Sequence, residues 1–173
     1  MRRIILGGGC FWCLEAAYKR LPGVVAVTSG YAGGDRESPS YEEVSSGLTS
    51  HAEVVAVDYD PEVVDLGALL DLFWRIHDPT TLDRQGADVG SQYRSVIFVA
   101  DESEKSLALA SKEEVAAHFE DTIVTEILGA PAFWPAENYH QNYYDQHPWA
   151  GYCRAVIAPK LRKIGLEGGG REG

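Results

Sequence analysis

The sequence RRIILGGGCFWCLEAAYKRL (2–21) joins an apolar run, three glycines and a pair of cysteines. Residues 2–6 are short and apolar, as in a buried strand. Residues 10–21 have the composition of a helix, which a Pro-Gly pair ends. This stretch therefore predicts a strand, a glycine turn and a helix that opens at Cys10.

Strand and helix patterns alternate along the rest of the chain. Apolar and β-branched runs predict strands at 24–30, 51–59, 95–100 and 122–127. Helical patterns cover 65–77, 102–118 and 136–146. Ser40 and Glu43 form a capping-box signature for a further short helix. Apart from this short helix, the predicted elements up to residue 100 have the order β-α-β-β-α-β, which predicts a ferredoxin-like split βαβ core.

Length and charge limit the class of protein. The 173 residues favour a single domain over 1–167, followed by a glycine-rich tail, 168–173, that we expect to be disordered. The net charge of −11 repels phosphate backbones and argues against nucleic acid as a partner. No apolar run approaches the roughly 20 residues that span a bilayer, and the N-terminal one is shorter than a signal peptide's. We therefore expect a cytoplasmic protein without membrane contact.

Three cysteines, Cys10, Cys13 and Cys153, point to thiol chemistry or metal binding, because an odd number argues against a disulfide framework. Cys10 opens the predicted helix, where unpaired N–H groups and the helix dipole favour a thiolate. We expect Cys10 to be the nucleophile of a thiol enzyme, with glycines that let the chain bend and leave room for a substrate. The alternative is a buried apolar side chain.

Cys10 and Cys13 also form a C-x-x-C pair, which is typical of thiol–disulfide exchange enzymes. Zinc normally needs four ligands, and neither Cys153 nor the histidines complete a known zinc spacing. We expect no metal or other cofactor. A general thiol–disulfide oxidoreductase and a small zinc-binding interaction module stay open as alternatives.

Four blocks carry a family resemblance, namely GGGCFWC (7–13), SPSYEEVSSGLTSHAEVV (38–55), QGADVGSQYRSVIF (85–98) and FWPAENYHQNYY (133–144). Together they resemble peptide methionine sulfoxide reductases of the A type. The resemblance implies an α+β two-layer sandwich, here with a long coil-rich C-terminal segment. It also implies reduction of the S-epimer of methionine sulfoxide, free or in proteins, with electrons from thioredoxin.

The resemblance assigns roles around the reacting sulfur. Cys10 would attack the sulfoxide sulfur, while Phe11 and Trp12 would hold the substrate methyl group in an apolar pocket. Otherwise the two aromatic residues would belong to the core. The block around His140 would form a helix behind the site, so we interpret His140 as structural.

The sulfoxide oxygen gains negative charge during attack and needs a proton donor with a pKa near neutrality. By resemblance, Glu53 and the hydroxyls of Tyr41 and Tyr93 would surround this oxygen. Strand alternation places Glu53 on the face of the apolar residues 55 and 57, where burial favours a neutral carboxyl. Asp88 lies in the long polar loop 78–94 and would join the same polar network. Its alternative role is to order that loop through backbone hydrogen bonds.

Two cysteines compete to resolve the sulfenic acid that Cys10 would carry. The commonest family motif has glycine in place of Cys13, and its resolving cysteine lies in a Gly-Tyr-Cys segment that matches 151–153. Cys13 is one helical turn from Cys10, whereas Cys153 precedes RAVIAPKLRKI (154–164), which has the composition of a packed segment. We therefore expect a Cys10–Cys13 disulfide, with a relay to Cys153 or a merely buried Cys153 as alternatives.

Overall fold

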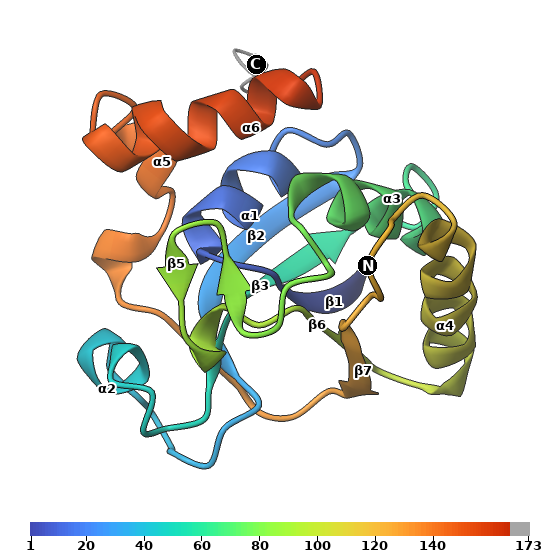
Figure 1. Ribbon diagram of the computed structural model, residues 1–173, viewed down its shortest axis with the longest axis horizontal. Coiled ribbons are helices and arrows are strands. Elements are labelled where there is room, and N and C mark those ends of the chain that lie inside the picture. Colours follow the sequence, from blue (N-terminus) through green and yellow to red (C-terminus); the bar gives the residue numbers. More distant parts are fainter. Residues whose placement is uncertain (167–173) are drawn as a thin grey trace.

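The computed structural model describes residues 1–166 and contains a curled six-stranded sheet covered by helices (Figure 1). The strands follow one another across the sheet in the order β7 (Glu126–Gly129), β6 (Val96–Val99), β1 (Arg2–Gly7), β3 (Ala52–Tyr59), β2 (Val24–Ala32) and β8 (Phe133–Pro135). All neighbouring strands are antiparallel except β6 and β7, which are parallel. The α+β class expected from the sequence is confirmed.

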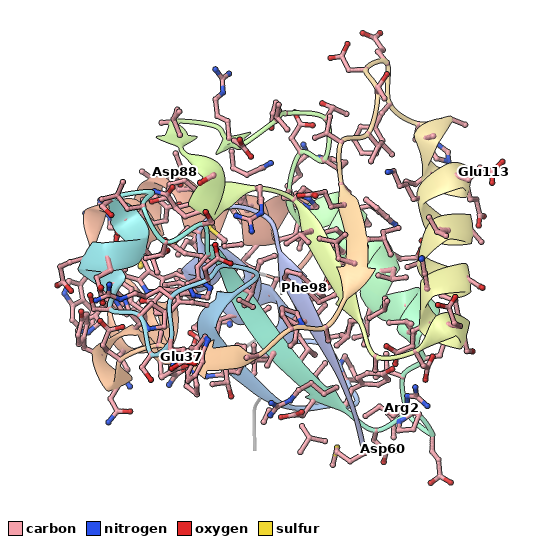
Figure 2. All side chains as sticks on the ribbon, turned by 90° about the horizontal axis from the view of Figure 1, so that it is seen from below. Arg2, Glu37, Asp60, Asp88, Phe98 and Glu113 are labelled. Carbon is pink, nitrogen blue, oxygen red and sulfur yellow. The ribbon has the colours of Figure 1, made fainter. Side chains whose placement is uncertain are left out.

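The helices differ widely in length. They are α1 (Phe11–Tyr18), α2 (Tyr41–Ser45), α3 (Leu66–Ile76), α4 (Glu102–Ala116), α5 (Tyr143–Gln146) and α6 (Ala158–Lys163). The main core packs one face of the sheet, including Val55 and Val57 of β3, against α1, α3 and the C-terminal segment. Val54 and Phe98 belong to a smaller cluster, and Figure 2 shows Phe98 near the middle of the sheet.

The antiparallel pairing of β1 and β3 brings two distant segments to one end of the sheet. Arg2 pairs with Tyr59, and Leu6 pairs with Val55. The end of β1, which leads to Cys10, therefore lies beside the start of β3. Figure 2 shows Asp88 at this end of the molecule, far from the labelled Arg2 and Asp60.

The start of α2 confirms the predicted capping box. The Ser40 hydroxyl accepts a hydrogen bond from the Glu43 backbone N–H at 3.2 Å, and the Glu43 carboxylate accepts one from the Ser40 N–H at 3.0 Å. These reciprocal bonds satisfy two N–H groups that the helix itself leaves unpaired. The helix therefore begins at Tyr41, whose position matters for the site.

Two predicted elements differ in the structure. The strand expected at 122–127 begins at Glu126, because the Val124 N–H donates to Pro79 outside the sheet at 2.8 Å. The helix expected at 136–146 is divided into a 3-10 turn, η2 (Asn138–His140), and the short α5. Asn142 between them has a left-handed backbone, φ 57°, which a continuous helix does not accept.

The C-terminal segment is more helical than the coil-rich segment that was expected. A π-helical turn, η3 (Cys153–Ile157), continues into α6 near α1 (Figure 1). Cys153, Ile157 and Leu161 recur every four residues and are fully buried, so one apolar stripe anchors the segment. The expected tail, 168–173, lies outside the described residues. Within residues 1–166, no helix combines the length and hydropathy of a membrane span.

Candidate active site

The glycine turn after β1 is set by close packing. A Cβ atom on Gly8 would lie 2.8 Å from the His77 ring, and Gly9 has φ +87° with Gln85 at 2.9 Å from such an atom. The sharp bend expected from the glycines is present at Gly9. The space beside these two glycines, however, is filled by side chains from 77 and 85 and is not left for a substrate.

Cys10 is the N-cap residue of α1 and is half-buried. Burial, and then the charge of Glu53, raise the pKa of Cys10 well above its ordinary value, while the backbone N–H of Trp12 opposes the shift. The lowered pKa expected from the helix start is therefore wrong for the resting site. Desolvation of the sulfur outweighs the helix terminus.

A cavity of about 150 Å³ opens at the Cys10 sulfur. The predicted nucleophile, apolar pair and polar residues all line it, and Tyr152 lines it as well. The full lining is Cys10, Phe11, Trp12, Tyr41, Glu53, Asp88, Tyr93 and Tyr152. These residues come from five separate stretches of the sequence. The cavity has both an apolar wall and proton-donating groups, which suits a small polar group attached to an apolar side chain.

Glu53 is buried near the start of β3, opposite Tyr31 on β2. Its carboxyl group accepts a hydrogen bond from the Phe11 backbone N–H at 3.2 Å. Burial, assisted by the charge of Asp88, raises the pKa of Glu53 to about 8, although the hydrogen bond opposes this. At neutral pH the carboxyl group is largely protonated and can donate a proton into the cavity.

Backbone hydrogen bonds position Tyr41 and Tyr93 at the cavity. The Tyr41 N–H donates to one oxygen of Glu137, and the Tyr31 hydroxyl donates to the other, both at 3.0 Å. Tyr93 ends the 3-10 turn η1 (Ser91–Tyr93), and its carbonyl accepts the Gly9 N–H at 3.1 Å. Burial raises the pKa of both Tyr41 and Tyr93, so their hydroxyls stay protonated and able to donate.

Aromatic rings form the wall beside the sulfur. Trp12 stacks on Tyr143 with ring centroids 3.8 Å apart, and Phe11 packs against His140 at 5.2 Å. His140 is buried, contacts the Tyr41 ring at 4.6 Å, and has a pKa lowered by burial. Its surroundings are those of a neutral packing residue, as the sequence interpretation had it.

Tyr152 is the site residue that sequence reasoning missed. Its hydroxyl donates to Asp88 at 2.7 Å, and its ring meets Trp12 edge-on with centroids 5.9 Å apart. Asp88 lies in a small hairpin of β4 (Arg84–Gln85) and β5 (Asp88–Val89) within the predicted loop. The signal was available in the Gly-Tyr-Cys segment 151–153, which we had used for its cysteine alone.

The remaining cysteines do not line the small cavity. Cys13 and Cys153 are both buried, and burial raises the pKa of each thiol. The Cys13 sulfur lies 3.8 Å from the Tyr152 hydroxyl. All three cysteines are free thiols in this structure.

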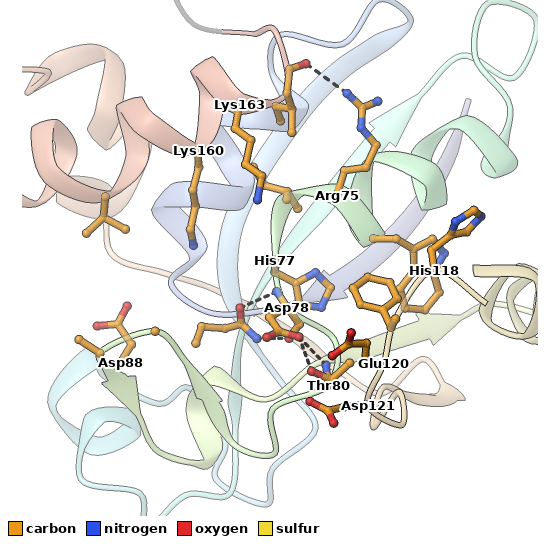
Figure 3. A pocket seen from close by; sticks show the side chains of 18 of the residues that line it. Arg75, His77, Asp78, Thr80, Asp88, His118, Glu120, Asp121, Lys160 and Lys163 are labelled. Carbon is orange, nitrogen blue, oxygen red and sulfur yellow. Dashed lines mark hydrogen bonds between the residues drawn. The ribbon is translucent and has the colours of Figure 1, made fainter. Parts of the chain in front are cut away.

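A second, larger cavity of about 910 Å³ lies beside the first. Figure 3 shows it between the end of α3, the β4–β5 hairpin and α6, with basic side chains on the α6 side and acidic ones opposite. Asp88 and Tyr152 line both cavities, so this pair stands between them. Across residues 1–166, no three side chains of metal-binding type converge on a point.

A half-buried cysteine that faces a protonated carboxyl and two tyrosine hydroxyls defines a thiol enzyme that can protonate a group beside its sulfur. The sequence model of the family described as peptide methionine sulfoxide reductase matches residues 2–168, and the chain belongs to that family.

Individual relatives agree with this assignment. Over 160 residues, the chain is 54% identical to a Nitratiruptor protein named peptide methionine sulfoxide reductase MsrA, with 92% of each chain covered. The reduced form of Mxr1 from Saccharomyces cerevisiae has a TM-score of 0.84 at 39% identity, covering 88% of each chain. Mxr1 in complex with Trx2 has a TM-score of 0.60 at 29% identity, covering 82% of this chain and 84% of that one.

Proposed function

We propose that this protein reduces the S-epimer of methionine sulfoxide, free or in proteins, to methionine. The observation that carries the proposal is the Glu53 carboxyl group, which is buried, has a pKa of about 8 and lines the same cavity as the Cys10 sulfur. A sulfoxide reductase needs this combination, because attack at sulfur must be coupled to protonation of the oxygen. Family membership and the 54% identity to an MsrA support the same activity.

The residues divide the reaction between them. Phe11 and Trp12 hold the methyl group of the substrate, so that its sulfur meets Cys10 and its oxygen meets Glu53. The S–O dipole then presents its positive end to Cys10, which favours the thiolate despite burial. The thiolate attacks the sulfur while Glu53 donates its proton to the oxygen. Methionine departs, and Cys10 keeps the oxygen as a sulfenic acid.

Hydroxyl groups and a carboxylate assist this step. The Tyr41 and Tyr93 hydroxyls donate hydrogen bonds to the oxygen as its charge grows, without losing their own protons. Asp88 accepts a hydrogen bond from the Tyr152 hydroxyl and so holds the Tyr152 side of the cavity in place. Its negative charge also raises the pKa of Glu53 and so keeps the Glu53 carboxyl group protonated.

Recycling proceeds through an intramolecular disulfide that thioredoxin reduces. We propose the Cys10–Cys13 pair, because Cys13 lies on the first turn of α1 and its N–H donates to the Cys10 carbonyl at 3.1 Å. A relay that passes the disulfide to Cys153 is the alternative. The likeness to Mxr1 in complex with Trx2 supports thioredoxin as the reductant. None of the comparisons favours a general thiol–disulfide oxidoreductase or a zinc-binding module.

We also propose three properties of the whole chain. The strand order β6-β1-β3-β2, with antiparallel neighbours, supports a ferredoxin-like split βαβ core and a two-layer sandwich. Residues 1–167 act as one catalytic domain, supported by a core that draws on both ends of the described chain. Three free thiols support a cytoplasmic location, where cysteines are kept reduced.

A stereospecific assay tests the function. Each epimer of methionine sulfoxide is offered separately with dithiothreitol as reductant, and methionine is quantified. We expect methionine from the S-epimer and none from the R-epimer, and none from either with the Cys10→Ser variant. Equal use of both epimers would contradict the proposed specificity. Turnover by Cys10→Ser would contradict the mechanism.

A further inference from the structure

Figure 3 shows Lys160 extending from α6 into the larger cavity. Its ammonium group lies 3.9 Å from the Cys13 sulfur. The side chain is half-buried, and none of the carboxylates in residues 1–166 forms an ion pair with it. A half-buried ammonium group without a carboxylate is free to stabilise another anion. The nearest candidate is the Cys13 thiolate.

Several titratable groups surround Cys13, and they act on its ionisation in both directions. They are Lys160 from α6, Tyr152 and Cys153 from the C-terminal segment, Asp88 from β5, Glu53 from β3 and Cys10 next to α1. Burial raises the pKa of Cys13, and the charges of Asp88 and Glu53 act in the same direction. Of the groups that lower the pKa of Cys13, Lys160 has the largest effect, followed by the Tyr152 hydroxyl. The thiolate at Cys13 therefore depends on Lys160.

We propose that Lys160 is the charge partner of Cys13 and makes Cys13 the resolving nucleophile of the enzyme. The proposal rests on the proposed function, because resolution requires the sulfenic acid at Cys10. The ammonium group contacts the sulfur that reacts, and it approaches from the side of the larger cavity. Lys160 would thus take part in the second half of the reaction and not in the first.

The resolving step balances without a further reactant. The Cys13 thiol gives its proton to solvent, and the thiolate remains beside Lys160. The Cys13 sulfur attacks the Cys10 sulfur, an S–S bond forms and the S–O bond breaks. The departing hydroxide takes a proton and leaves as water. Cys13 is oxidised, and the sulfenic sulfur of Cys10 is reduced.

Cys10 and Cys13 also differ in how easily a reductant can reach them. Cys10 is half-buried in the small cavity, whereas Cys13 is buried, so an incoming thiolate can reach the Cys10 sulfur. Cys13 then leaves as a thiolate beside Lys160, and a stabilised leaving thiolate speeds the exchange. The structure therefore assigns attack by the reductant to Cys10.

Lys160→Gln tests the proposal, with Lys160→Arg as the charge-preserving variant and Lys163→Gln as the matched control. Lys163 lines the same cavity from the same helix, and no contact between it and a cysteine sulfur occurs in the described structure. The first measurement is the pH titration of thiolate absorbance in a Cys10→Ser, Cys153→Ser background, where Cys13 is the single thiol. The second is rapid-quench kinetics on the otherwise unmodified protein with one equivalent of methionine sulfoxide.

We expect Lys160→Gln to raise the titration midpoint of Cys13 by about one unit or more, as the loss of an opposite charge at this distance does. Disulfide formation at neutral pH should then slow about tenfold. Methionine release in the first turnover should be unchanged, which also shows that the variant is folded. Lys160→Arg should restore most of the rate, and Lys163→Gln should resemble the unmodified protein.

Three outcomes would overturn the assignment. They are an unchanged Cys13 midpoint in Lys160→Gln, an unchanged rate of disulfide formation, or an equal loss with Lys163→Gln. Failure of the proposed function looks different, because the unmodified protein itself would then release no methionine. The titration of Cys13 needs no substrate, so its result stands in either case.

Discussion

The Tyr152 hydroxyl donates a 2.7 Å hydrogen bond to Asp88, and both residues line the cavity at Cys10 as well as the cavity beside α6. One residue comes from the β4–β5 hairpin and the other from the segment before η3. Their hydrogen bond therefore ties the proposed substrate side of the enzyme to the side from which Lys160 approaches Cys13.

Tyr152→Phe should lower kcat/KM about 10- to 100-fold, because a hydrogen bond to a charged group contributes roughly 1.5–3 kcal/mol. The Asp88 carboxylate would lose its donor beside Cys10 and Cys13. Asp88→Asn keeps an acceptor for the Tyr152 hydroxyl, and it should lower the pKa of Glu53 by removing a neighbouring negative charge. Steady-state kinetics over a pH series separates the two variants. An unchanged kcat/KM in Tyr152→Phe would show that the pair has no part in the reaction.

The activity should fall as the pH rises through about 8, where Glu53 loses the proton that it donates. Glu53→Gln keeps the shape of the side chain and cannot donate a proton as an acid. We expect a loss of about 10²–10⁴-fold in kcat/KM and disappearance of this alkaline limb. The measurement is the pH profile of S-epimer reduction. A limb that persists in Glu53→Gln would assign the titration to another group.

The same carboxyl group should make the folded protein less stable in alkali. The folded pKa of Glu53, about 8, lies above its ordinary 4.5, so between these values the folded state binds more protons than the unfolded state. Its contribution is fully present below pH 4.5 and is lost as the pH rises through 8. The difference is on the order of 5 kcal/mol. Urea unfolding should show Glu53→Gln more stable than the unmodified protein at about pH 9 and similar to it at about pH 5.

One equivalent of methionine sulfoxide, given without a reductant, should leave Cys10 joined to Cys13 and Cys153 free. Rapid alkylation and peptide mapping by mass spectrometry report the pairing. The buried, helical position of Cys153 is the physical reason, because the segment must leave its packing to reach Cys10. A Cys10–Cys153 disulfide in every molecule, with Cys13 free, would show that this movement occurs and that the local pair is not used.

Much of the local structure could be predicted from the sequence because it depends on near neighbours. Ser40 and Glu43 cap a helix whatever lies beyond it, and strand alternation is enough to place Glu53 with Val55 and Val57. Asn142 is the counterexample, since its left-handed backbone divides a helix that residues 136–146 otherwise indicate. Asparagine tolerates that conformation, yet nothing nearby requires it.

Seven of the eight residues that line the small cavity could be named from the sequence, but their electrostatics could not. The pKa of Cys10 depends on burial and on the charge of Glu53, in a cavity that Asp88 and Tyr93 line from one distant stretch and Tyr152 lines from another. A helix start alone therefore gave the wrong direction. Lys160 was missed for a related reason, because its closeness to Cys13 exists only once the C-terminal segment has packed against α1.

The cavity at Cys10 has a volume of only about 150 Å³, which limits how much of a protein-bound substrate it can hold. A methionine sulfoxide must leave its own surroundings and insert its sulfur end, while its backbone stays outside. For a substrate within a protein, the proposed reaction therefore requires an oxidised side chain that is exposed or that can be extruded. An oxidation that loosens the structure around the affected methionine helps to meet this requirement.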